Sequence, residues 1–141
     1  MPHVCTSFSG RRWRHFVPSL LVLTGITYLS LIKEMPAPVL GNIPLADKWG
    51  HMLAYMVLSL CMAADSYRAH ISVRGLYLTA ILLPIAYGGL IELIQPHFPP
   101  RQGEWMDWLA DCIGVSIGIL IFTVWYYLMN RRKTPSSTSN A

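Results

Sequence analysis

Eight polar residues beside apolar segments carry side chains suited to acid–base chemistry, anion binding or metal binding. They are Asp47, Lys48, His51, Glu92, Gln95, Arg101, Asp107 and Asp111. Glu92 is the most unusual of them, because it lies in the last turn of an apolar run that begins near Gly75. A charged side chain at membrane depth costs roughly 2.5–3.5 kcal/mol on insertion scales, so it usually faces a partner or a water-filled cavity. We therefore treat these eight residues as one candidate site.

The residue types suggest a division of roles within this site. His51 and Glu92 have the side chains most used for general acid and base catalysis, and we assign them those roles as a hypothesis. Asp107 and Asp111 are expected to orient them or to hold a divalent metal ion. The remaining members are assigned to substrate binding, with the two cations holding an anionic group: Asp47, Lys48, Gln95 and Arg101.

The spacing of these residues predicts shared helix faces. Asp47 and His51 are four residues apart, as are Asp107 and Asp111, and Glu92 and Gln95 are three apart. Side chains at these separations are neighbours on a helix surface. In a compact bundle the three faces can converge on one pocket. A purely structural clamp, in which the same residues bond to one another and hold the helix ends together, remains the alternative.

The composition indicates an all-α, polytopic membrane protein. The 141 residues are 53% hydrophobic and 13% charged, against about 25% charged in ordinary soluble domains. Apolar stretches predict a bundle of four transmembrane helices, at about 16–32, 50–65, 75–95 and 106–129, within one domain covering 16–129. Residues 1–15 and 130–141 are predicted to be tails, the second of them disordered. Nothing in the sequence suggests a nucleic-acid partner.

Basic residues predict the orientation of this bundle. Most of the 11 Lys and Arg residues lie in the two tails and in the connection between the second and third helices. By the positive-inside rule both termini are cytoplasmic. All eight candidate residues would then lie near the outer membrane surface.

Three further features concern the helices themselves. Gly114 and Gly118 form a small-xxx-small pattern, which predicts close approach of another helix. Pro84 predicts a kink in the third helix. Residues 65–74 are predicted to form a polar loop.

The site motifs resemble those of the VanZ-like family of small bacterial membrane proteins. The resemblance rests on three pieces in order, which are Asp47-Lys48-x-x-His51-x-x-x-Tyr55, Tyr87-Gly88-x-x-Ile91-Glu92-x-x-Gln95, and Arg101 followed by Asp107-x-x-x-Asp111-x-x-Gly114. It implies a multi-pass protein of the bacterial inner membrane. The family is named after a protein associated with low-level resistance to the glycopeptide teicoplanin, and the resemblance implies no particular activity for this chain.

The hypothesis we favour is a protein that acts on or binds a lipid-linked or phosphorylated component of the cell envelope. Whether it is an enzyme stays open, because no motif specifies a reaction. One alternative is a protein that binds or transports a small ligand. The other is a non-catalytic scaffold that meets a second copy or another membrane protein, with the polar residues serving only the fold.

Overall fold

The computed structural model describes residues 12–31, 45–99 and 103–131, and these residues form helices and short turns without a strand. A 3-10 turn at Arg12–Phe16 leads into α1 (Val17–Leu31), and α2 spans Ala46–Arg68. A continuous helical stretch follows, with α3 (Val73–Tyr77), a π-helical segment η2 (Leu78–Leu82), α4 (Leu83–Ile94) and a 3-10 turn η3 (Gln95–His97). The last helix, α5, spans Trp105–Arg131. The prediction of an all-helical chain with four long helical stretches is confirmed.

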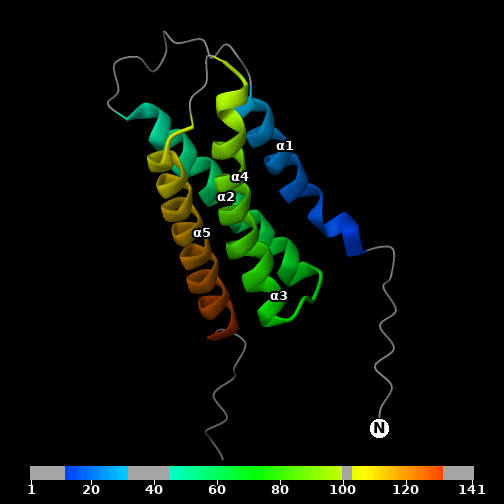
Figure 1. Cartoon of the computed structure of the whole chain (residues 1–141). Helices are drawn as coiled ribbons and strands as arrows, with labels where there is room; N and C mark the ends of the chain where they lie inside the picture. Colours follow the sequence, from blue (N-terminus) through cyan, green and yellow to red (C-terminus); the bar gives the residue numbers. More distant parts are fainter. Residues whose placement is uncertain (1–11, 32–44, 100–102, 132–141) are drawn as a thin grey trace, which may run out of the picture.

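Helix α2 lies at the centre of the bundle, with α5, α1 and the α3 to α4 stretch packed around it (Figure 1). Its buried face consists of Tyr55, Leu58, Met62 and Ala63. These side chains pack with Ile26 of α1, Ala80 of η2, and Val115 and Phe122 of α5. One apolar core therefore joins all the helical stretches.

Two glycines allow α5 to lie directly on α2. A β-carbon at Gly114 would overlap the carbonyl oxygen of Met52, and one at Gly118 would lie 2.6 Å from the carbonyl oxygen of Met56. The close approach predicted from the small-xxx-small pattern is confirmed. Its partner helix is α2.

Pro84 lies just after the π-helical segment, and the change of helix type explains how the chain accommodates it. A proline has no N–H, so it cannot donate to the carbonyl four residues earlier, which is that of Ala80. Ser59 of α2 donates its hydroxyl to this carbonyl at 2.7 Å. The predicted disturbance of the helix at Pro84 takes the form of a π-helical turn, a common adjustment within α-helices.

The prediction of a polar loop at 65–74 is wrong at both ends, because α2 continues to Arg68 and α3 begins at Val73. Asp65 is fully buried within this last turn. Its Oδ2 accepts hydrogen bonds from the hydroxyl and the main-chain N–H of Ser19, at 2.5 and 3.2 Å, and Arg68 donates to its Oδ1 at 3.0 Å. A carboxylate from α2 thus satisfies a free N–H in the first turn of α1, where a negative charge also favours the helix dipole.

Among the residues that the structure describes, two helical stretches are long and apolar enough to cross a membrane, Val73–His97 and Trp105–Arg131. Only 22% of the most apolar window of each is buried inside the protein. Large apolar side chains such as Leu82, Leu93 and Leu120 are more than half exposed. Soluble monomers rarely expose apolar surface on this scale, so contact with lipid accounts for it best.

Candidate functional site

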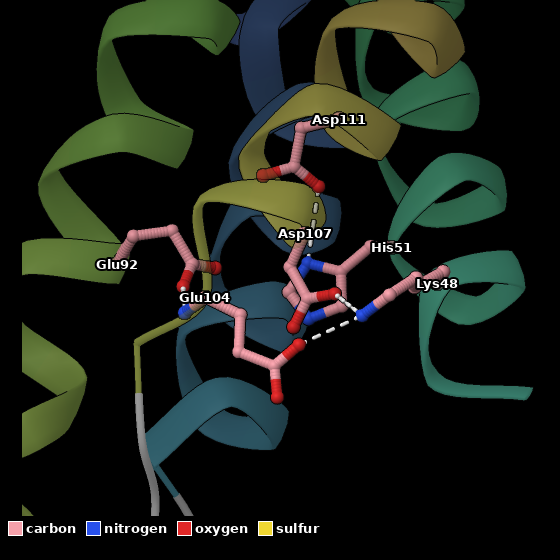
Figure 2. A network of polar contacts seen from close by, with 6 residues as sticks. All are labelled: Lys48, His51, Glu92, Glu104, Asp107 and Asp111. Carbon is pink, nitrogen blue, oxygen red and sulfur yellow. Dashed lines mark hydrogen bonds and ion pairs between the residues drawn. The ribbon is translucent and has the colours of Figure 1, made fainter. Parts of the chain in front are cut away.

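The candidate site lies at one end of the bundle, where α2 and α5 begin and α4 ends (Figure 1). Lys48 and His51 come from the first turns of α2, Glu92 from the last turn of α4, and Asp107 and Asp111 from the first two turns of α5 (Figure 2). The convergence of three helix faces expected from spacing is therefore present for these five residues.

Lys48 joins α2 to α5 through two carboxylates. Its Nζ lies 2.8 Å from Asp107 Oδ1 and 2.9 Å from Glu104 Oε2 (Figure 2). The side chain of Asp107 is 5% exposed and that of Glu104 is 57% exposed, so only the first pair is shielded from water. The hydrogen bond to Asp107, together with the weaker effect of Glu104, raises the pKa of Lys48 above its ordinary value. Lys48 therefore stays charged at neutral pH with its ammonium group already engaged.

His51 and Asp111 form the second contact between these helices. The Nδ1 of His51 lies 3.0 Å from Asp111 Oδ1. The side chain of Asp111 is 1% exposed, whereas that of His51 is 14% exposed at the end of the bundle. A buried carboxylate that holds an imidazole in one orientation is the usual arrangement both for a histidine base and for a histidine metal ligand.

Glu92 is held by the start of α5. Its Oε2 accepts a hydrogen bond from the main-chain N–H of Glu104 at 2.8 Å. The connector passes closely here, because a β-carbon at Gly103 would overlap the main-chain carbonyl of Glu92. The carboxylate of Glu92 is therefore held in place through Oε2, and its other oxygen, Oε1, takes no part in this bond.

Two buried carboxylate oxygens have no hydrogen-bond partner among the described residues. They are Glu92 Oε1 and Asp111 Oδ2. Asp111 Oδ2 packs against α4 at Gly88, where an added β-carbon would lie 2.7 Å from it. Gly88 is one turn before Glu92 on α4, so both unpaired oxygens lie between α4 and α5. Leaving such a group buried and unpaired costs about 1–3 kcal/mol each, and more for a charged group.

Of the remaining predicted site residues, Asp47 lies at the edge of this centre, with a ligand atom within 4.8 Å of those of His51 and Asp107. Asp47 is exposed in the first turn of α2. Gln95 is buried, and its amide donates to the carbonyl of Ser30 at 3.4 Å, which ties α4 to α1. Gln95 and Glu92 therefore reach different neighbours although they are three residues apart. Arg101 lies outside the described residues.

Two residues near the site were not assigned a role from the sequence. The main-chain N–H of Glu104 holds Glu92, and the side chain of Glu104 pairs with Lys48. Tyr55 is 1% exposed, and its ring lies beside Gly88, 3.2 Å from where a β-carbon would be. Its spacing of four from His51 was the signal that places it on the same face.

Two groups of three side chains bring possible metal ligands together. One contains His51, Glu92 and Asp111, and the other contains Asp47, His51 and Asp107. Within each group one ligand atom per residue lies within 4.8 Å of the others. Asp107 and Asp111, which we expected to act together on a metal, fall into different groups.

The described residues form a small helical bundle that has two stretches apolar enough to cross a membrane and polar side chains buried where its helix ends meet. The chain belongs to the VanZ/LLP1 family, whose model matches residues 6–126. This confirms the resemblance found in the site motifs. No curated protein and no solved structure is significantly similar to the chain.

Proposed function

We propose that this chain is a four-span protein of the bacterial inner membrane, with both termini in the cytoplasm and the polar site at the outer surface. The site binds a lipid-linked or phosphorylated component of the cell envelope, and His51 and Glu92 act on it as acid and base. The described basic residues support the orientation, because those other than Lys48 lie at the end opposite the site: Arg12, Arg14, Arg68, Arg74 and Arg131.

The observation that carries the proposal is the pair of buried, unpaired oxygens on Glu92 and Asp111. A clamp that served only the fold would satisfy its buried polar groups, since most such groups in proteins are bonded. Asp111 Oδ2 instead lies against α4 at Gly88, and the carboxylates of Glu92 and Asp111 are close to the partly exposed imidazole of His51. A ligand that donates hydrogen bonds or carries positive charge would complete them.

The chemistry open to this arrangement is proton transfer by an oriented imidazole. Asp111 fixes the ring of His51 through Nδ1, which leaves Nε2 for a ligand. Glu92 supplies a second carboxylate, which comes from α4, whereas that of Asp111 comes from α5. Lys48 is already shared between Asp107 and Glu104, so recognition of an anionic head group needs a further positive charge.

The thermal stability of detergent-purified protein tests the proposal without a known reaction. A ligand that binds only the folded state adds about 2.7 kcal/mol of stability at 100 times its Kd. We expect a short-chain polyprenyl phosphate to raise the Tm of the wild type, and the corresponding polyprenol, which lacks the phosphate, to raise it less. Glu92→Gln should abolish the difference between the two, and Glu104→Gln is the matched control that should keep it.

The scaffold alternative is favoured by one observation, which is that three of the site contacts join α2 to α5. It predicts that Glu92→Gln lowers the Tm to the same extent with and without any head group. That result, with no head group acting on the wild type, would replace a ligand site by a structural clamp.

A further inference from the structure

We propose that His51, Glu92 and Asp111 bind a divalent first-row transition-metal ion, Zn²⁺ or Mn²⁺, between α2, α4 and α5. This names the cofactor of the proposed site and gives His51 and Glu92 the role of metal ligands in place of acid and base. The inference rests on the proposed function only for what the bound ion does. The three residues come from three different helices and have one ligand atom each within 4.8 Å of the others.

The unpaired oxygens are the first argument. Glu92 Oε1 and Asp111 Oδ2 are both buried without a partner, and Asp111 as a residue is 1% exposed. Their other oxygens are held by the Glu104 N–H and by His51. Each carboxylate is therefore positioned by one oxygen and offers the other, which is how an outer hydrogen bond usually orients a metal-ligating carboxylate.

Charge balance is the second argument. Among the described residues Lys48 is the only Lys or Arg at this end of the bundle, and it is taken up by Asp107 and Glu104. Within the part of the chain that the structure describes, Glu92 and Asp111 then have only the imidazole of His51 to offset two negative charges. Burying uncompensated charge costs several kcal/mol per ion. A divalent cation bound to two carboxylates and a neutral imidazole gives a neutral group.

The dimensions suit a small transition-metal ion. With metal–ligand bonds of about 2.0–2.1 Å, neighbouring ligand atoms of a tetrahedral site are about 3.3 Å apart. One ligand atom from each of His51, Glu92 and Asp111 lies within 4.8 Å of the others, so the three residues need only draw together slightly to reach this spacing. The imidazole ligand favours Zn²⁺ over Ca²⁺ and Mg²⁺, which prefer oxygen ligands throughout, and the two carboxylates also suit Mn²⁺.

The choice between the two possible triads follows from their partners. In the group of Asp47, His51 and Asp107, Asp47 is exposed to water and Asp107 Oδ1 is bound by Lys48. In the group of His51, Glu92 and Asp111, each carboxylate has a free oxygen. Three protein ligands also leave a fourth position for water or substrate, as catalytic zinc sites do.

A bound divalent ion would resolve the difficulty with anion recognition in the proposed function. It would supply the positive charge that Lys48 cannot, and a phosphate oxygen could take its open position. The ion would be reached from the end of the bundle, where the side chain of His51 is 14% exposed.

The test is a titration of chelator-stripped, detergent-purified protein with Zn²⁺ and with Mn²⁺, read by calorimetry and by elemental analysis after gel filtration. We expect one ion per chain. Changes outside the first coordination shell already cost about 10–100-fold in metal affinity, so losing a ligand should cost at least about 10-fold. Glu92→Gln and Asp111→Asn should show this loss, and Asp47→Asn and Glu104→Gln should bind as the wild type does.

Two outcomes of the titration would overturn the assignment. Binding lost in Asp47→Asn and kept in Glu92→Gln would move the ion to the competing triad. A folded wild type that binds neither ion would exclude the site. Substitution with Co²⁺ gives an absorption spectrum that reports His51 and carboxylate ligation, and it keeps the test informative for variants of lowered stability. Metal binding without a response to polyprenyl phosphate would uphold the metal site and refute the proposed function. A rise in Tm with polyprenyl phosphate in a protein that binds neither ion would uphold the proposed function and refute the metal site.

Discussion

The main chain of Gly114 in α5 lies against the carbonyl oxygen of Met52 in α2, with no room for a β-carbon between them. Met52 directly follows His51, and Gly114 comes three residues after Asp111, so this contact sets how closely the two side chains approach. The packing of α5 against α2 therefore determines the geometry of the site.

Gly114→Ala should destabilise the protein and disturb the site. The added methyl group meets main-chain atoms of Met52 and Met56, which cannot move aside as a side chain can. Overpacking of this kind costs about 1–3 kcal/mol. Gly50→Ala is the matched control, because nothing lies within 4 Å of its β-carbon and alanine favours helix by up to about 1 kcal/mol. Equal unfolding temperatures for the two variants would contradict the close packing of α2 and α5.

Lys48→Met should destabilise the protein, mainly because Asp107 loses its partner. The loss of the ion pair with Glu104 should contribute little. Removing the ammonium leaves the buried carboxylate of Asp107 without this partner, at a cost of about 1–3 kcal/mol. Glu104→Gln weakens an exposed pair, for which the usual value is below about 1 kcal/mol. Denaturation of both variants in the same detergent measures the difference, and a larger effect from Glu104→Gln would reverse this ranking.

Ser19→Ala should lower stability by about 1–3 kcal/mol, because the buried carboxylate of Asp65 loses its hydroxyl donor. Ser116→Ala is a suitable comparison, since that exposed hydroxyl bonds only within its own helix, to the carbonyl of Cys112. Thermal unfolding of the two variants distinguishes a specific contact between α1 and α2 from a general effect of losing a serine. If both changes were neutral, Asp65 would not be acting as a cap for α1.

Ser59→Ala should cost about 1 kcal/mol in the wild type and less when Pro84 is also replaced by alanine. Ser59 donates to the carbonyl of Ala80, which the ring of Pro84 leaves without its usual helical donor. In Pro84→Ala a main-chain N–H becomes available for that carbonyl. A double-mutant cycle measures the coupling, and strictly additive effects would show that the two residues act independently.

The orientation of the bundle can be tested by fusing reporters to the C-terminus. With both termini in the cytoplasm, a fluorescent protein that folds only in the cytoplasm should be active and a periplasmic phosphatase should not. An active phosphatase would place the Glu92 site on the cytoplasmic side and remove the proposed envelope substrate.

Patterns along a single helix could be recognised from the sequence. Apolar length and composition predicted four helical stretches, and the spacing of Gly114 and Gly118 predicted a close helix contact. The four-residue separation of Asp107 and Asp111 predicted that both face the same neighbour, and both do meet α2, at Lys48 and His51. Each of these features follows from the helical repeat alone.

What only the tertiary structure decided is which faces meet. Glu92 and Gln95 share a helix face by spacing, yet Glu92 contacts the start of α5 and Gln95 reaches α1. Asp65 looked like a loop residue until Ser19 of α1 was found against it. The unpaired oxygens of Glu92 and Asp111 likewise depend on the position of α4 relative to α5. Pairing between residues distant in sequence depends on how packed helices are rotated and shifted relative to one another. Neither quantity can be read from the periodicity of a single helix.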